Sequence, residues 1–367
     1  MHVVHFILDP RFGGPHQYVK TIAGQLRGKV ECMIVTAGRG PVTDIALVNL
    51  RHHWYPLYLL EVPINVCYVI VLALLGRIPR GRSCIFNVHG AANIAPLIAA
   101  WVLRKPVVWH FHETMPWVRS LVRTGRFFIA TLKHRLVTVA PEVAGVFALR
   151  DYTVLRPPID TGFWQRDTDR PPGSGETLQF LDIVSIGNLN PIKGQDLLLA
   201  AAGGLQCGFR IRFVGAELAN HAGYARKLAA EKERLCNDNP RAAIEFLGWQ
   251  DAASIRSLLA HCDVLVLPSR TEACPIVLLE AMAMECVCVA TDVGGVRGII
   301  RSPAQGYVVR PESSEALAGA FGKVCSMTAA ERKAMGQAAR QRICEEFNMK
   351  RVAAQHLDLY QNLVTAP

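Results

Sequence analysis

Residues 262–283 read CDVLVLPSRTEACPIVLLEAMA, and this stretch decides the fold class. It opens with a continuous apolar run at 264–267, passes through a Pro-Ser turn and continues as a helical pattern at 277–284. A short strand without polar alternation is typical of a parallel sheet that helices cover on both faces. The stretch therefore predicts one strand–turn–helix unit of an α/β domain.

The same alternation extends over the chain in two blocks. Strand-like runs occur in the first block at 3–8, 32–35, 84–88, 107–111 and 137–139, and in the second at 180–186, 211–214, 243–247, 287–291 and 306–309. The polar segment 167–176, DTDRPPGSGE, separates the blocks and indicates a linker. We therefore predict two doubly wound, Rossmann-like α/β domains, 1–166 and 177–347, facing across a cleft, and a last helix within 348–367.

Composition excludes several classes of protein. With 51% hydrophobic and 19% charged residues, the chain is neither disordered nor of low complexity. Its 11 Cys are scattered and form no C-x-x-C pair, which favours free thiols in a reducing compartment. The first residues lack the basic segment and cleavage site of a signal peptide. We expect a cytoplasmic protein.

The apolar segment 62–76 is the best candidate for membrane contact. It is fifteen residues long, whereas a helix needs about twenty apolar residues to cross a bilayer. A buried helix is the favoured interpretation, and a shallow interfacial segment is the alternative.

Charge is unevenly divided along the chain. Residues 1–170 hold 20 Lys and Arg against 10 Asp and Glu, whereas residues 171–367 hold 20 of each. The excess suggests an anionic partner (a membrane surface, an acidic substrate or nucleic acid) or serves solubility alone. The basic and aromatic segment 119–135 favours an anionic membrane face, unless it is a core helix with a solvated basic side. No helix-turn-helix, RRM or zinc pattern supports nucleic acid, and we expect none.

Two segments carry charged groups at the ends of predicted strands that suit phosphate and sugar hydroxyls. Glu272 and Glu280 are eight residues apart, and Glu280 lies about two turns into the expected helix, so its carboxylate faces back toward the loop that carries Glu272. The unpaired N–H groups at the start of the same helix suit a phosphate. Alternatively, Glu272 and Glu280 are two surface glutamates. The turn 187–194, GNLNPIKG, follows a strand, and Lys193 is a plausible charge for a diphosphate, unless it is an ordinary loop lysine.

The order of these segments along the chain is more informative than each segment alone. The turn GNLNPIKG precedes FLGW at 246–249, the stretch at 262–283 and VATDVGG at 289–295. That series resembles the second domain of the retaining GT-B glycosyltransferases of family GT4, the glycosyl transferases group 1, over about 180–345. In the first half the resemblance is thinner. It rests there on Gly13 and Gly14, on His89 and His112, and on PPIDTGF at 157–163.

The resemblance implies roles for individual residues. Lys193 would neutralise the donor diphosphate, Glu280 would hold the ribose hydroxyls, and Glu272 would lie near the transferred sugar. His112 would reach the sugar and acceptor, so that Glu272, Lys193 and His112 are the implied catalytic residues. The last helix, in 348–367, would cross back onto the first domain. The implied donor-binding residues are Gly13, Gly14, Gly187, Asn188, Lys193, Gly215, Glu272, Ala273, Cys274, Ile276, Val277 and Glu280.

Three positions depart from the family pattern. Asn188 stands where the family usually has Arg, which removes a cation whose charge-assisted hydrogen bond is worth about 1.5–3 kcal/mol, unless Arg11 substitutes for it. Glu285 stands for a frequent Gly, and Arg297 with Gly298 for Pro-Glu. With these changes, a wholly inactive relative of the family remains an alternative interpretation of the chain.

The implied activity is retaining transfer of a hexosyl group from a UDP- or GDP-linked donor to a saccharide or lipid-linked acceptor. The resemblance implies neither a metal nor a cofactor besides the donor. Alternatives are a non-catalytic scaffold at the inner face of the membrane, a nucleotide-sugar epimerase and a phosphorylase. His110 and His112 share a strand face, but no further cluster is tied to them, so we expect no metal site. The D-x-D at 167–169 lies in the linker, where solvated charges are expected.

Overall fold

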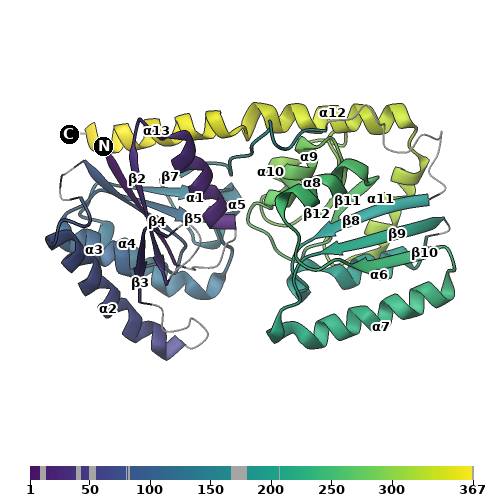
Figure 1. Cartoon of the computed structure of the whole chain (residues 1–367), viewed down its shortest axis with the longest axis horizontal. Coiled ribbons are helices and arrows are strands. Elements are labelled where there is room, and N and C mark those ends of the chain that lie inside the picture. The colour runs from purple at the N-terminus through teal and green to yellow at the C-terminus, as the bar shows by residue number, and fades with distance from the viewer. Residues whose placement is uncertain are drawn as a thin grey trace. The chain divides into compact units, whose positions relative to one another are not determined.

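The computed structural model describes residues 1–8, 14–38, 43–48, 55–79, 81, 83–166, 180–205 and 207–365, without the side chains of 37 and 55–60. Two compact units make up the chain. Met1–Pro158 and Met349–Pro367 form the first unit, and Ile159–Asn348 forms the second. Each contains a parallel sheet flanked by helices, as Figure 1 shows.

The first unit has a seven-stranded sheet in the order β3-β2-β1-β4-β5-β6-β7. Its strands are β1 His2–Ile7, β2 Glu31–Ala37, β3 Ile45–Leu47, β4 Cys84–His89, β5 Val107–Phe111, β6 His134–Thr138 and β7 Tyr152–Val154. Its helices are α1 Gly14–Gln25, α2 Tyr55–Leu74, α3 Ala95–Leu103, η1 Pro116–Val118, α4 Arg119–Ile129, α5 Pro141–Val146 and α13 Met349–Thr365.

The second unit has a six-stranded sheet in the order β10-β9-β8-β11-β12-β13. Its strands are β8 Phe180–Ile186, β9 Gly208–Val214, β10 Ala242–Phe246, β11 Val264–Leu267, β12 Val287–Thr291 and β13 Tyr307–Val309. Its helices are η2 Pro191–Lys193, α6 Gln195–Ala202, η3 Ala219–His221, α7 Ala222–Asp238, α8 Ala252–His261, α9 Ile276–Ala283, α10 Val296–Ile299, α11 Ser314–Ser326 and α12 Ala329–Glu346.

Both sheets follow the doubly wound order of the Rossmann fold, which confirms the predicted fold class. In each sheet the winding direction reverses between two adjacent strands: β1 and β4 in the first unit, β8 and β11 in the second. Ligands of such sheets bind at this reversal, outside the carboxyl ends of the strands. The loops after these four strands are therefore the places to look for a site.

The apolar runs of the sequence are explained by burial on both faces of a sheet. In β11, Val264 and Val266 belong to one hydrophobic core and Leu265 and Leu267 to the other. Because successive strand residues point to opposite faces, a strand covered on both sides must be apolar throughout. The second unit thus has two cores, one on each face of its sheet.

Residues 159–166 belong to the second unit, although we predicted them in the first domain. Ile159 N donates to Phe347 O at 2.8 Å, Trp164 is buried in a core of the second unit, and Arg340 donates to Trp164 O at 2.9 Å. The side chains of a segment we took as preceding the linker therefore complete the second core. The predicted linker, 167–176, lies outside the described residues.

Two helix predictions need correction. The segment 62–76 is not a fully buried helix, because Ile64, Val71 and Leu74 of α2 are 46%, 45% and 62% exposed. The basic segment 119–135 is helical only as far as Ile129, and its last residues begin β6. Across the described ranges, no helix combines the length and apolarity that crossing a membrane requires.

Candidate functional site

A lysine and a glutamate meet at the carboxyl ends of β8 and β11. Lys193 ends η2, and Glu272 lies in the loop after β11. Lys193 Nζ is 2.7 Å from Glu272 Oε1, and the buried Ser269 hydroxyl donates to the same oxygen at 2.8 Å. The Lys193 side chain is 33% exposed and that of Glu272 only 10%, so the ammonium is the more open group.

Gly194 allows the two loops to touch. Its φ is +67°, and a Cβ there would lie 2.0 Å from the carbonyl oxygen of Pro268, a separation that no side chain can occupy. Arg270 N donates to Ile192 O at 2.7 Å across the same contact. The turn that carries Lys193 and the loop that carries Glu272 are therefore held as one surface.

An ion pair beside this contact uses the second cation of the region. The Arg270 guanidinium donates to both carboxylate oxygens of Asp196, at 2.9 and 3.0 Å, and its Nε lies 2.8 Å from Glu312. Burial acts to raise the pKa of Asp196, but hydrogen bonds from Arg270 and Tyr224 outweigh it and hold that pKa below its usual value. Arg270 is thus neutralised by carboxylates and serves to fix the loops.

Gly294 supports the backbone beside Glu272. It has φ +50°, and a Cβ would lie 1.7 Å from Glu272 O. The next residue, Gly295, donates its N–H to Ala273 O at 2.9 Å. The backbone of Gly294 and Gly295 therefore packs directly against the backbone of residues 272–273.

The loops after β8 and β9 are also in backbone contact. A Cβ on Gly215 would lie 2.3 Å from Gly187 O. The side-chain oxygen of Asn188 accepts from Ala216 N at 3.0 Å, and Gly187 lies against the aliphatic stem of Lys193. Asn188 therefore ties β8 to β9, and it brings no charge toward Lys193.

Helix α9 presents its first turn to the same edge of the sheet. Leu278 and Leu279 are fully buried in the core, whereas Ile276 and Val277 are only partly buried. Glu280 lies four residues after Ile276 and three after Val277, so it is on the same side of the helix, and it is 7% exposed. Its carboxylate is thus held close to the protein interior.

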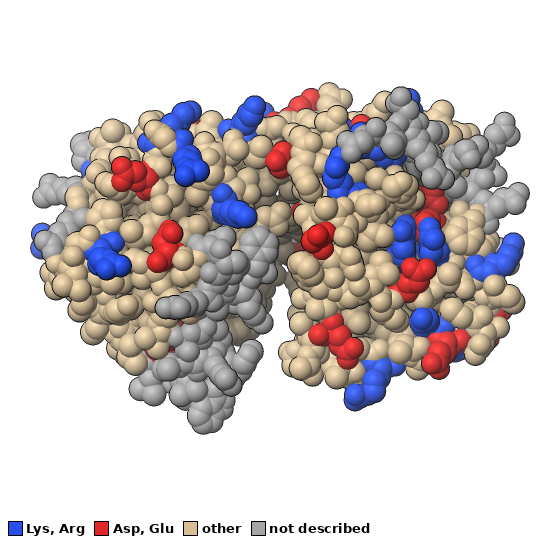
Figure 2. Space-filling view, in the orientation of Figure 1, with Lys and Arg blue, Asp and Glu red and all other residues tan. Residues whose placement is uncertain are grey.

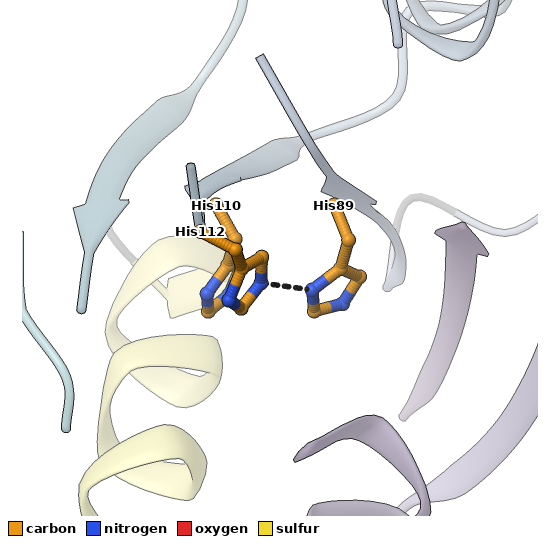
Figure 3. Close-up of side chains that lie close together, drawn as sticks. All are labelled: His89, His110 and His112. Carbon is orange, nitrogen blue, oxygen red and sulfur yellow. Dashed lines mark hydrogen bonds between the residues drawn. The ribbon is translucent and has the colours of Figure 1, made fainter. Parts of the chain in front are cut away.

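The first unit gathers histidines at the ends of its central strands, and Figure 3 shows three of them. His89 ends β4, His110 lies in β5 and His112 follows β5. His89 Nδ1 is 2.9 Å from His112 Nε2, and the rings of His89 and His110 stack with centroids 4.6 Å apart. We expected no further histidine with His110 and His112, and this was wrong.

Two more histidines continue the cluster into the core. His5 of β1 lies 3.2 Å from His89 Nε2, and His356 of α13 stacks on His110 at 5.6 Å. Burial, and to a smaller extent the neighbouring His356, lowers the pKa of His5 and of His112 to about 3, and burial lowers the pKa of His356 to about 4. These imidazoles are neutral hydrogen-bonding groups at neutral pH.

Comparison with known proteins places the chain in a family. The sequence profile of "Glycosyl transferases group 1" matches residues 169–342. An alpha-maltose-1-phosphate synthase of Mycobacterium tuberculosis is 30% identical over 375 residues, which cover 97% of this chain and 86% of that enzyme. The chain belongs to the group 1 glycosyltransferases.

Two further similarities bear on how much of this group 1 glycosyltransferase is matched. An N-acetyl-alpha-D-glucosaminyl L-malate synthase of Bacillus anthracis is 31% identical over 119 residues, only 32% of this chain and 30% of that relative. The crystal structure of Anabaena HepE with UDP and glucose is 18% identical, with a TM-score of 0.81 over 99% of this chain and 100% of that one. The second likeness shows that the group 1 glycosyltransferase has the GT-B fold.

The structure of this group 1 glycosyltransferase joins some implied site residues directly. Lys193 and Glu272 are in contact, and Gly187, Asn188 and Gly215 pack beside them. Ala273, Cys274, Ile276, Val277 and Glu280 follow on the same loop and helix. His112 and Gly14, the first residue of α1, are in the first unit, and Gly13 and Arg11 lie outside the described residues.

Several residues at or beside the candidate site of the group 1 glycosyltransferase were missed by sequence reasoning. Ser269 and Arg270 were seen only as a turn, although both contact the loop residues that carry the site. His5 and His356 carried no signal in the sequence, because their partners are 84 and more than 200 residues away.

Proposed function

We propose that the chain transfers a hexosyl group from a UDP- or GDP-linked sugar to an acceptor hydroxyl, with retention at the anomeric carbon. The observation that carries the proposal is the contact of Lys193 Nζ with Glu272 Oε1 at the reversal of the second sheet. The UDP in the structurally similar HepE complex is consistent with a nucleotide donor.

Lys193 and Glu272 would exchange partners when the donor binds. Without donor, Glu272 balances the lysine charge. A diphosphate would take over the ammonium, and the first-turn N–H groups of α9 would assist, since a helix N-terminus favours anions. The released carboxylate would then accept hydrogen bonds from sugar hydroxyls, and the buried Ser269 hydroxyl would keep it in place.

The chemical step needs stabilisation of the leaving group rather than a strong base. The bond from the anomeric carbon to the diphosphate oxygen breaks, the bond to the acceptor oxygen forms on the same face, and the acceptor proton passes to the departing diphosphate. Lys193 would stabilise the negative charge that develops, which is the usual source of large rate effects. His112, whose pKa is lowered to about 3 by desolvation so that the imidazole is neutral at neutral pH, would donate or accept a hydrogen bond at the sugar. No metal ion takes part in this scheme.

We further propose that the acceptor is a lipid-linked or cell-surface saccharide met at the inner face of the cytoplasmic membrane. Helix α4 exposes Arg119, Arg123 and Arg126, together with Phe127, which is 75% exposed. Trp117, just before α4, is 65% exposed. Basic and aromatic side chains in this combination suit an anionic membrane interface.

The basic excess is not a property of the whole surface. On the face shown in Figure 2, acidic and basic side chains are interspersed over each unit, and the described residues there form no continuous basic field. A local patch at α4 is therefore a better account of membrane contact than net charge alone.

A panel of nucleotide-sugars tests the proposal, with release of nucleoside diphosphate and transfer to added acceptors as readouts. Lys193→Ala and Glu272→Ala should lose activity, and Lys333→Ala, at an exposed lysine of α12, should not. Donor binding without turnover would favour a scaffold, a changed sugar without transfer would favour an epimerase, and absence of any nucleotide binding would refute the proposal.

A further inference from the structure

Three imidazoles of the first unit lie close enough to hold one ion. The nitrogen atoms that His89, His110 and His112 can offer all lie within 4.8 Å of one another. In Figure 3, the stacked rings of His110 and His112 overlap in the view, and a dashed line joins His112 to His89. We propose that these three histidines bind a divalent transition-metal ion of the zinc class, which prefers imidazole ligands.

The strongest support is His110, which is completely buried. Among the described residues, neither of its ring nitrogens has a hydrogen-bond partner. Buried polar atoms without partners cost free energy and are rare in folded proteins. A metal bond to one nitrogen would satisfy an atom that the protein itself leaves unsatisfied.

Metal coordination requires the three side chains to rotate more than it requires their nitrogens to move apart. Zinc–nitrogen bonds of about 2.0–2.1 Å in a tetrahedron place ligand nitrogens about 3.3 Å apart. His89 Nδ1 and His112 Nε2 are already 2.9 Å apart, so they need only separate slightly. The three rings stack, with angles of 7° between His110 and His112 and 21° between His89 and His110, so binding must rotate side chains until each ring points its nitrogen at the ion.

Neighbouring groups are placed as supports of such a site. His89 Nε2 is 3.2 Å from His5 Nδ1, which leaves Nδ1 of His89 for the ion, and metal-binding histidines commonly use their second nitrogen in this way. The Glu113 carboxylate accepts from His112 N at 3.0 Å and from Ala91 N at 2.5 Å, and so joins the ends of β4 and β5. His112 is partly exposed, and a solvent molecule would complete the coordination.

An ion here would act as an inhibitor. Coordination uses the lone pair of His112 and turns its ring, so the imidazole can no longer serve the sugar. This consequence rests on the proposed function, whereas binding of the ion does not.

Cobalt(II) titration of the full, chelator-treated chain tests binding without any turnover. We expect one equivalent, with the intense visible absorption of four-coordinate Co²⁺, displaced by Zn²⁺. His110→Phe keeps a flat ring in the stack and removes only unpartnered nitrogens, so it should fold while weakening binding at least about 100-fold, since even loss of a supporting partner costs roughly 10–100-fold. His112→Gln, at the partly exposed ligand, is the second variant and should weaken binding similarly.

His261→Asn, at an exposed histidine of the second unit, is the matched control and should bind like the parent chain. No intense absorption, or absorption that survives both His110→Phe and His112→Gln, would overturn the proposal, and loss in His261→Asn would identify surface binding instead. If transfer activity is found, Zn²⁺ should inhibit the parent chain and spare His110→Phe. If none is found, the proposed function fails and the cobalt titration still decides the metal site.

Discussion

Replacing Gly194 by Ala should destabilise the second unit in two ways, through an unfavourable backbone conformation and through a steric clash. At φ +67° a non-glycine residue costs about 1–2 kcal/mol. The added Cβ would also lie 2.0 Å from Pro268 O, so the two loops must part by about 1 Å to reach an ordinary contact, and such overpacking costs about 1–3 kcal/mol. We expect the second unit to lose about 2–5 kcal/mol of unfolding free energy.

Gly248 supplies the matched control, because it has nearly the same φ, +65°, and nothing within 4 Å of an added Cβ. Gly248→Ala should therefore cost only the backbone part, about 1–2 kcal/mol. Urea unfolding followed by hydrogen exchange of peptides from the second unit measures both variants in the full chain. Because Lys193 precedes Gly194, a shift of about 1 Å should also lower transfer rates by about 100-fold.

The reasoning would be refuted by Gly194→Ala being no less stable than Gly248→Ala. Equal transfer rates in the two variants would separately refute the claim that the loop contact positions Lys193.

Three further predictions follow from the same structure. Lys193→Ala should lower kcat by about 100- to 1,000-fold, the usual effect of removing a group that stabilises developing negative charge. Steady-state kinetics with Lys333→Ala as the control measures this loss, and a normal kcat with only a higher KM would contradict the role of Lys193. Reversing Arg119, Arg123 and Arg126 to Glu should weaken sedimentation with anionic vesicles by about 100-fold at low salt, whereas reversing the exposed Arg226, Lys227 and Lys333 of the second unit should not; equal loss in both would show a nonspecific charge effect. Burial raises the pKa of the Cys32 thiol to about 11, which leaves about 0.1% thiolate at pH 8. Iodoacetamide should therefore label the exposed Cys67 and Cys344 before Cys32, as followed by peptide mass spectrometry, and early labelling of Cys32 would show that β2 opens readily.

The fold was predictable where local sequence carries the constraint. A strand buried on both faces is largely apolar, so β11 and β12 could be located from their apolar runs alone. The short strands β3 and β7 were not predicted, although the equally short β13 was. Residues 159–166 were assigned to the wrong unit, since the partners that hold them, Phe347 and Arg340, are 176 or more residues away.

The candidate site divides in the same way. Lys193 and Glu272 could be assigned to one site before the structure because the family resemblance implies it, and the two strands that they follow proved to be neighbours. The role of Asn188 could not, since only the fold brings Ala216 N within hydrogen-bonding distance of its side chain. The histidine cluster is assembled from β1, β4, β5 and α13, and nothing local in the sequence marks such an assembly.

Helix α13 has a consequence for how the protein is made. Its Tyr360 is fully buried in the first unit, within hydrogen-bonding distance of Asn87, and its His356 meets Tyr18 at 2.9 Å. Because these residues follow the second unit in the chain, a ribosome releases the whole second unit before it delivers the helix that fills the first. During synthesis the second unit can therefore mature early, while the earlier-made half stays exposed to chaperones and proteases until the final turns emerge.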